Sequence, residues 1–166
     1  MNTQRPTRVL GVDPGYERMG LAIIERGKTI DRLVVSLCAR TPKDLPLPTR
    51  IGMLAEETRA LIAKYTPDTI AFERIFWNQS TTTALGVAEV RGMLSTLAQE
   101  FRLAVFEYSP QQIKVAITGY GASDKRAVSL MLPRLLEMPE RKRLDDELDA
   151  IAIGLTCLAS TRAYQT

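Results

Sequence analysis

The first forty residues contain three strand-like segments whose connections are too short to hold a helix. Residues 8–13, 20–25 and 29–39 are rich in Val, Ile and Leu. Pro14-Gly15 separates the first two segments, and Arg26-Gly27-Lys28 separates the second from the third. Because parallel neighbours need a crossover of about a dozen residues or more, strands joined this tightly must run antiparallel. The fold is therefore expected to begin with an antiparallel meander.

Helices and strands alternate after this meander. Apolar residues recur every three or four positions from Thr49 until Pro67 stops the pattern, which predicts a helix. The segments that follow are a strand at 69–73, a helix at 81–100, a strand at 103–108, and helices starting at Ser109-Pro110, at Ser123 and at about residue 144. We expect Ser109 and Ser123 to cap their helices and Pro133 to kink or break the second of these. The order predicts an α/β fold with a mixed five-stranded sheet and helices on both faces.

Length and composition favour one cytoplasmic domain. The chain has 166 residues, which fits a single domain spanning 1–166. No apolar stretch approaches the ~20 residues of a membrane span, and the first residues lack the apolar middle of a signal peptide. The two cysteines, Cys38 and Cys157, each lie in an apolar run, which is typical of core residues in a reducing compartment. The net charge of +3 leans mildly toward anionic partners.

The chain contains no histidine. This absence excludes Ser-His-Asp and Cys-His hydrolases, histidine general bases and almost every kind of zinc site. Any catalysis must come from carboxylates, lysines, hydroxyls or a metal held by oxygen.

Four acids stand where the local pattern calls for apolar packing. Asp13 and Glu73 end apolar strands, and Asp146 and Asp149 open the last helix, three apart and so on one face. Each has an ordinary alternative: a turn-forming Asp, an ion pair of Glu73 with Arg74 or an outward-facing Glu73, and acids that compensate the helix dipole. If the acids converge, their repulsion requires a hard cation such as Mg²⁺ or Mn²⁺. Two such ions about 4 Å apart would activate a water and stabilise the leaving oxygen in phosphodiester cleavage.

One basic stretch and one aromatic residue could bind an anionic or base-containing partner. Lys114 and Lys125 lie in a stretch, 109–134, that holds Asp124 as its one acid, so a phosphate-binding groove is one interpretation and ordinary surface lysines are the other. Phe76 follows the strand of Glu73, where an exposed ring could stack on a base and a buried one would pack in the core.

Five motifs in order make the sequence similar to a known family. They are Gly11-Val12-Asp13-Pro14-Gly15, Phe72-Glu73-Arg74-Ile75-Phe76, Tyr108-Ser109-Pro110-Gln111-Gln112-Ile113-Lys114, Gly119-Tyr120-Gly121-Ala122-Ser123-Asp124-Lys125 and Asp146-Glu147-Leu148-Asp149-Ala150-Ile151-Ala152-Ile153. Together they resemble the RuvC family of Holliday-junction resolvases. The resemblance implies a ribonuclease-H-like fold, a homodimer and Mg²⁺-dependent paired, symmetric nicking of four-way DNA junctions in recombination and repair. It also implies a branch-migration complex of the RuvA and RuvB type as a partner.

The resemblance assigns roles position by position. It implies that the four carboxylates hold two Mg²⁺ ions per subunit, with Mn²⁺ able to substitute; these residues are Asp13, Glu73, Asp146 and Asp149. It implies that Lys114 and Lys125 contact the scissile region and act in catalysis, and that Phe76 stacks on a junction base.

The sequence departs from the family pattern at two points and leaves others open. Arg74 stands where the family commonly has Gln; it could bind DNA phosphate or weaken metal binding. Pro133 is unexpected within its helix. In some members the first of the acidic pair is a histidine, and whether Asp145 replaces or assists Asp146 stays open. The helix at 81–100 is implied to form the dimer interface, with packing against its own sheet as the alternative.

Three other functions share some of these features. Another ribonuclease-H-like nuclease would use the same carboxylates on RNA–DNA hybrids or other branched DNA, and substrate preference discriminates it. A non-catalytic junction-binding subunit would bind tightly without nicking. An acetate- or sugar-kinase-like ATPase also starts with a Gly-x-Asp strand, but the chain is short for its two domains.

Overall fold

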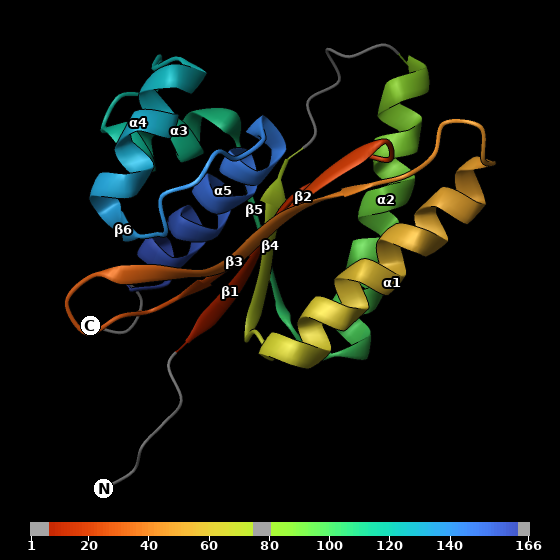
Figure 1. The fold of residues 1–166 in the computed structure, drawn as a ribbon, viewed down its shortest axis with the longest axis horizontal. Coiled ribbons are helices and arrows are strands. Elements are labelled where there is room, and N and C mark those ends of the chain that lie inside the picture. The colour runs from red at the N-terminus through yellow and green to blue at the C-terminus, as the bar shows by residue number, and fades with distance from the viewer. Residues whose placement is uncertain (1–6, 75–80, 163–166) are drawn as a thin grey trace, which may run out of the picture.

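The computed structural model describes residues 7–74 and 81–162. A six-stranded sheet in the order β5-β4-β1-β2-β3-β6 carries helices on both faces (Figure 1). The strands are β1 (Arg8–Asp13), β2 (Arg18–Glu25), β3 (Asp31–Arg40), β4 (Thr69–Glu73), β5 (Ala104–Tyr108) and β6 (Leu136–Glu137). The helices are α1 (Leu47–Tyr65), α2 (Thr81–Glu100), α3 (Pro110–Thr118), α4 (Lys125–Leu135) and α5 (Asp145–Arg162).

The sheet is mixed, as the short connections predicted. β1 pairs antiparallel with β2, and β2 pairs antiparallel with β3, so the expected meander is confirmed. β4 and β5 then add parallel strands on the other side of β1. Each is reached through a helix, α1 or α2, which supplies the length that a parallel connection needs.

The sixth strand corrects the predicted count of five. β6 has two residues and pairs in parallel with Asp31 and Arg32 at the start of β3. So short a segment shows no period in the sequence, and it follows α4 without a turn signal, which is why the pattern did not reveal it.

α4 differs in two details from the sequence expectation. Its N-cap is Asp124, which accepts a hydrogen bond from the Ala127 amide, whereas Ser123 instead shares a hydrogen bond with Thr118. The helix continues through Pro133 to Leu135, so the break comes two residues later than Pro133. Near a helix end, proline removes one backbone hydrogen bond but leaves little helix to disrupt.

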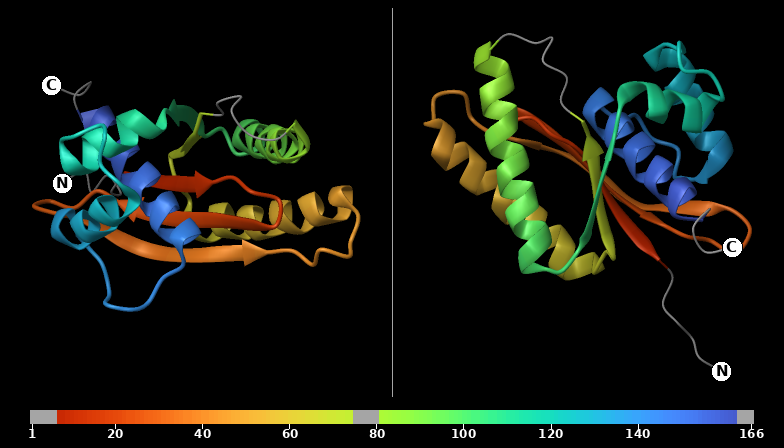
Figure 2. Two further views of the ribbon diagram at one scale, coloured as in Figure 1. Left: turned by 90° about the horizontal axis from the view of Figure 1, so that it is seen from above. Right: turned by 180° about the vertical axis from the view of Figure 1, so that it is seen from behind.

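The two faces of the sheet bury separate apolar clusters. α1 and α2 cover one face, and α3, α4 and α5 cover the other (Figure 2). Leu10 and Val12 of β1 belong to the cluster under α1 and α2, while Val9 belongs to the one under α5. The expectation of helices on both faces is confirmed. In the described ranges 7–74 and 81–162, no helix has both the length and the apolarity to cross a membrane.

Candidate active site

Strand alternation directs Asp13 and Glu73 to the same face. Val12 of β1 is paired in parallel register with Phe72 of β4, and both side chains lie in the cluster under α1 and α2. The next residue on each strand points to the opposite face because side chains alternate along a strand. Asp13 and Glu73 are therefore neighbours at the ends of adjacent parallel strands, facing α5.

α5 lies against this face with almost no space between helix and sheet. A methyl group on Gly11 of β1 would overlap the carbonyl oxygen of Ala150, and one on Gly20 of β2 would overlap the carbonyl oxygen of Asp146. Backbone-to-backbone packing of this kind requires glycine. It brings the first turns of α5, which carry Asp146 and Asp149, directly over the end of β1.

A buried carboxylate fixes the rotation of α5 about its axis. Glu147 accepts hydrogen bonds from Ser36 Oγ of β3 at 2.8 Å and from Arg141 Nη2 at 2.5 Å. It also accepts one from the Leu144 amide at 3.3 Å, as a residue in the first turn of a helix can. Burial raises the pKa of Glu147, but the bonds from Arg141 and Ser36 outweigh it and lower the pKa. With Glu147 held toward β3, Asp149 is turned toward β1 and β4.

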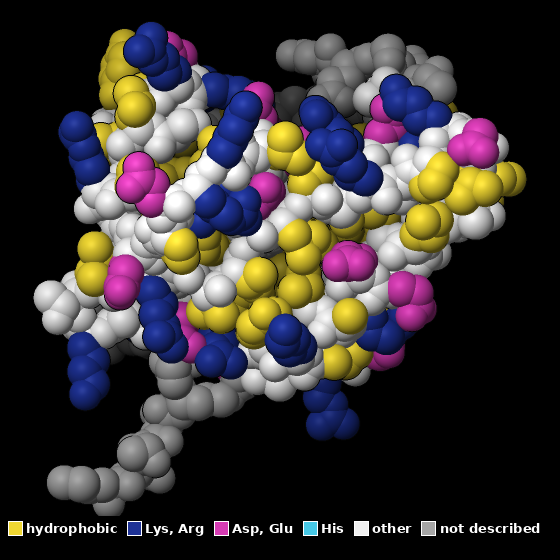
Figure 3. Space-filling model, viewed as in Figure 1, with side chains coloured by type: hydrophobic (Ala, Val, Ile, Leu, Met, Phe, Trp, Pro, Cys, Tyr) yellow, Lys and Arg dark blue, Asp and Glu magenta, His cyan; other side chains and the backbone are white. Residues whose placement is uncertain are grey.

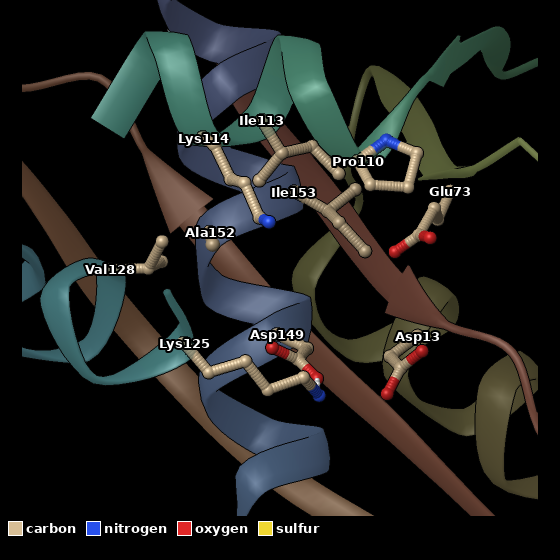
Figure 4. Close-up of a pocket in the computed structure, with 10 residues that line it drawn as sticks. All are labelled: Asp13, Glu73, Pro110, Ile113, Lys114, Lys125, Val128, Asp149, Ala152 and Ile153. Carbon is tan, nitrogen blue, oxygen red and sulfur yellow. Dashed lines mark hydrogen bonds and ion pairs between the residues drawn. The ribbon is translucent and has the colours of Figure 1, made fainter. Parts of the chain in front are cut away.

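Five predicted site residues line one cavity of about 370 Å³ (Figure 4). The full lining is Asp13, Glu73, Pro110, Ile113, Lys114, Lys125, Val128, Asp149, Ala152 and Ile153. Three carboxylates and two ammonium groups thus meet above an apolar floor. They come from β1, β4, α3, α4 and α5, so only the folded chain assembles them.

The acids of this cavity repel one another. Burial, followed by the charges of Asp149, Glu73 and Asp146, raises the pKa of Asp13 to about 7, against a smaller opposing effect of Lys125. Burial and then Asp149 also raise the pKa of Glu73, while Lys125 and Lys114 lower it. The carboxylates are close enough to disfavour one another's ionisation, which is the crowding that a cation relieves.

The two lysines enter the cavity from different helices. Lys125, at the start of α4, donates a hydrogen bond from Nζ to Oδ2 of Asp149 at 2.8 Å, and this bond raises the pKa of Lys125. Lys114 lies on α3, whose start is fixed by a reciprocal hydrogen-bonded cap between Ser109 and Gln112. Figure 4 shows both ammonium groups directed into the cavity.

Asp146 is turned partly away from the other acids. Its Oδ2 lies 3.5 Å from Arg18 Nε and 3.8 Å from Cys38 Sγ, and it does not line the cavity. Its charge nevertheless contributes to the raised pKa of Asp13. Asp145 is exposed at the start of α5, where its charge acts on Lys125.

Of the two predicted DNA contacts at the end of β4, the structure places one. Arg74 is exposed and has its Nε 3.9 Å from Glu107 Oε2, so its partner in the structure is Glu107 and not Glu73. Phe76 lies outside the described residues, and both assignments stay predictions.

The donor set fits a hard divalent cation. Carboxylate oxygens are the ligands that Mg²⁺ and Mn²⁺ prefer, and burial together with the neighbouring carboxylates disfavours the ionised form of Asp13 at this point. Within the part of the chain that the structure describes, no three acidic or cysteine side chains have the spacing of a finished metal site. Instead, the ammonium of Lys125 partly compensates the charge, through Asp149.

Sequence reasoning missed two residues that support this site. Glu147 appeared to be one more acid in a charged run, although its place in the first turn of a helix is a known capping signal. Arg91 of α2, which donates to the backbone of Glu73, gave no signal in the sequence. On the face seen in Figure 3, basic and acidic side chains are interspersed, so surface charge alone does not mark the site.

Comparison with known sequences gives a consistent result. The family model described as crossover junction endodeoxyribonuclease RuvC matches residues 9–157. A protein of that name from Thermotoga petrophila is 38% identical over 156 residues, which are 94% of this chain and 94% of the relative.

Solved structures show the same similarity. Thermus thermophilus RuvC in complex with Holliday junction substrate matches with a TM-score of 0.89 and 28% identity, over 95% of this chain and 96% of that one. The yeast mitochondrial Holliday junction resolvase Ydc2 matches with a TM-score of 0.69 at 15% identity, over 96% of this chain and 82% of that one, a likeness of fold alone. The predicted ribonuclease-H-like α/β fold is confirmed.

Proposed function

The chain belongs to the RuvC family of crossover junction endodeoxyribonucleases, and on that premise we propose that it resolves Holliday junctions by paired, symmetric nicks made at the cavity between β1, β4 and α5. The observation that carries this mechanism is the convergence of Asp13, Glu73 and Asp149 with two lysines. Those side chains supply both halves of the chemistry that phosphodiester hydrolysis needs: oxygen ligands for cations and positive charge for the phosphate.

The family is divalent-metal dependent, and we propose that two Mg²⁺ ions bind per subunit, with Mn²⁺ able to substitute. Asp13, Glu73 and Asp149 would hold them together with Asp146, which contributes to the negative potential at Asp13. When bound, divalent ions supply an activated water and compensate charge on the departing 3′ oxygen. The raised pKa of Asp13 supports this assignment, because burial and three neighbouring carboxylates destabilise the ionised form and a bound cation would stabilise it.

The chain's own side chains bind and orient the phosphate. Lys114 and Lys125 would neutralise charge that develops on the scissile phosphate, acting from the rim opposite Glu73. Arg74 is exposed just beyond Glu73 and would contact the DNA backbone. Phe76 would stack on a base of the opened junction.

Assembly and location extend the proposal. Residues 1–166 would form one nuclease domain that acts as a homodimer through α2, because a junction must be cut on two strands. A branch-migration complex of the RuvA and RuvB type would deliver the substrate, and the enzyme would work in the cytoplasm.

The deciding experiment uses a mobile four-way junction labelled in turn on each strand. We expect cuts at symmetric positions on two opposite strands in Mg²⁺ and none in EDTA. Preferential cutting of an RNA–DNA hybrid would contradict the proposed substrate, and tight junction binding without any nick in Mg²⁺ or Mn²⁺ would contradict catalysis.

A further inference from the structure

Glu73 lies where β4 stops, and its backbone is held at that point by a side chain from another element. The last registered pair of β4 with β1 is Phe72 with Val12, so Glu73 lies one residue beyond that ladder. Arg91 of α2 donates from Nη1 to the carbonyl oxygen of Glu73 at 2.6 Å. Glu73 still pairs with Tyr108 of β5, but its carbonyl has no partner on the β1 side and is satisfied there by a charged donor.

The same peptide group is held at its other end too. The amide of Arg74, which shares a peptide plane with the Glu73 carbonyl, donates to the Tyr108 carbonyl of β5 at 2.8 Å. Because the peptide group is planar, fixing its oxygen and its nitrogen fixes ψ of Glu73. The ψ angle sets how the peptide plane after Glu73 lies relative to the Cα–Cβ bond of Glu73. Holding this angle therefore stabilises the direction in which the Glu73 side chain projects from the strand.

Arg91 is itself firmly held. Its Nη2 donates to Glu107 Oε1 at 2.7 Å, and its guanidinium lies 4.9 Å from the ring centroid of Phe72. Its side chain is 15% exposed, so this charge is largely removed from water and depends on those partners.

Arg91 acts from the opposite side of the sheet to the cavity. Phe72 packs in the cluster that includes Val90 and Leu94 of α2, while Glu73 lines the cavity on the α5 face. Figure 2 shows α2 and α5 on different faces of the sheet. Arg91 therefore reaches the site through the backbone and without entering the space where DNA or cations would lie.

We propose that Arg91 is a positioning residue for Glu73, which locks the peptide plane at the end of β4 so that this carboxylate meets Asp13 and Asp149. The inference rests on the proposed function of Glu73 as a metal ligand. Groups that orient ligands from outside the coordination sphere typically change metal affinity or activity by about 10- to 100-fold when removed.

The test measures Mn²⁺ binding directly, through the loss of the free-ion electron paramagnetic resonance signal. Arg91→Met keeps an apolar stem and removes both donors; we expect its Mn²⁺ dissociation constant to rise about 10-fold or more while its affinity for a four-way junction in EDTA stays unchanged. Arg91→Lys restores one donor and should recover part of the loss. A dissociation constant for Arg91→Met equal to that of the wild type would overturn the proposal.

Arg59→Met is the matched control. Arg59 also links α2 to another element, through Glu100, but does so at the far end of that helix. We expect this variant to bind Mn²⁺ as the wild type does, and an equal loss in both arginine variants would refute a specific role for Arg91. If Arg91→Met does not fold, Glu107→Ala removes the anchor but keeps the arginine, and should weaken Mn²⁺ binding a few-fold; no change there would overturn the proposal.

Asp13→Asn separates this inference from the function on which it rests. If Asp13→Asn still cuts junctions, the proposed site itself is wrong. If Asp13→Asn is inactive and Arg91→Met binds Mn²⁺ normally, the site stands and the role of Arg91 alone is refuted.

Discussion

The ammonium of Lys125 lies 2.8 Å from Oδ2 of Asp149, so the chain places a cation of its own among the acids of the cavity. This position has two opposite effects. The charge suits a phosphate approaching the cavity, but it also competes with any other cation for Asp149. The two effects are separable by measuring cleavage and metal binding independently.

Lys125→Met is expected to slow junction cleavage about 100-fold at saturating Mg²⁺, the size of effect seen when one stabilising donor is removed. The same variant should bind Mn²⁺ more tightly than the wild type, because Asp149 loses its competing partner. Single-turnover cleavage and Mn²⁺ titration measure the two quantities. Lys28→Met, in the turn at the opposite end of the sheet, is the control and should change neither. Parallel losses of cleavage and Mn²⁺ affinity would count against this account.

Asp13→Asn is expected to abolish cleavage and keep junction binding, because it removes a central oxygen ligand but none of the basic side chains. Gel-shift binding in EDTA and cleavage in Mg²⁺ measure the two properties on one junction. Asp44→Asn, an exposed acid in the loop after β3, should match the wild type in both. Equal loss of binding and cleavage in a folded Asp13→Asn protein would falsify the ligand role.

The raised pKa of Asp13 predicts how the stability of the metal-free protein depends on pH. The pKa is about 7 in the folded state against an ordinary value of 3.8, so between these values the folded state binds more protons than the unfolded state. The free energy of unfolding should therefore fall as pH rises from about 4 to about 7, by about 4 kcal/mol at most.

This effect is isolated by comparing the wild type with Asp13→Asn in urea at several pH values, in EDTA. The asparagine variant should gain stability relative to the wild type across that range, and Mg²⁺ should stabilise the wild type more. Glu25 and Glu147, whose pKa values are lowered by their arginine partners despite burial, act in the opposite direction in both proteins and cancel in the difference. A difference that does not vary with pH would contradict the charge crowding.

Glu147→Gln tests the hydrogen bonds from Ser36 and Arg141 that hold α5 in place. The variant should lose about 1–3 kcal/mol of stability at pH 7, because Arg141 and Ser36 lose a charged, buried acceptor. Since the pKa of Glu147 is lowered in the folded state, its contribution is present above the ordinary carboxyl pKa and disappears as pH falls through the folded value. Urea unfolding at pH 7 and pH 3.5 measures this. Glu140→Gln, exposed in the loop before α5, should have no effect. A similar loss in both variants would show that negative charge near this loop matters, and not the hydrogen bonds of Glu147.

Much of the fold followed from the sequence because its signals are local. Short connections dictated the meander, and apolar spacing located α1, α2 and α5 within a few residues of their observed ends. β6 and the Asp124 cap escaped for a physical reason: two residues carry no period, and Ser123 and Asp124 are equally good caps until the neighbouring Thr118 hydroxyl engages one of them.

Part of the site could be predicted from the sequence, because an acidic residue within an apolar segment is easily noticed. Asp13, Glu73 and Asp149 do lie together, because alternation on parallel neighbours and the approach of α5 bring them there. Asp146 turns toward Arg18 because of tertiary contacts that no local pattern encodes. Arg91 was invisible for the same reason, since it binds a backbone carbonyl that every residue possesses.

The glycines under α5 also limit how this enzyme can be redesigned. There is no room for even one more carbon between α5 and Gly11 or Gly20. The absence of a side chain at these two positions therefore determines the distance between the acids of α5 and those of the sheet. A larger residue there would lift Asp149 away from Asp13 while leaving every charged group intact. An attempt to change which ion the enzyme prefers should therefore begin with these two glycines, because they set the distance between α5 and the sheet. The carboxylates themselves can be exchanged afterwards.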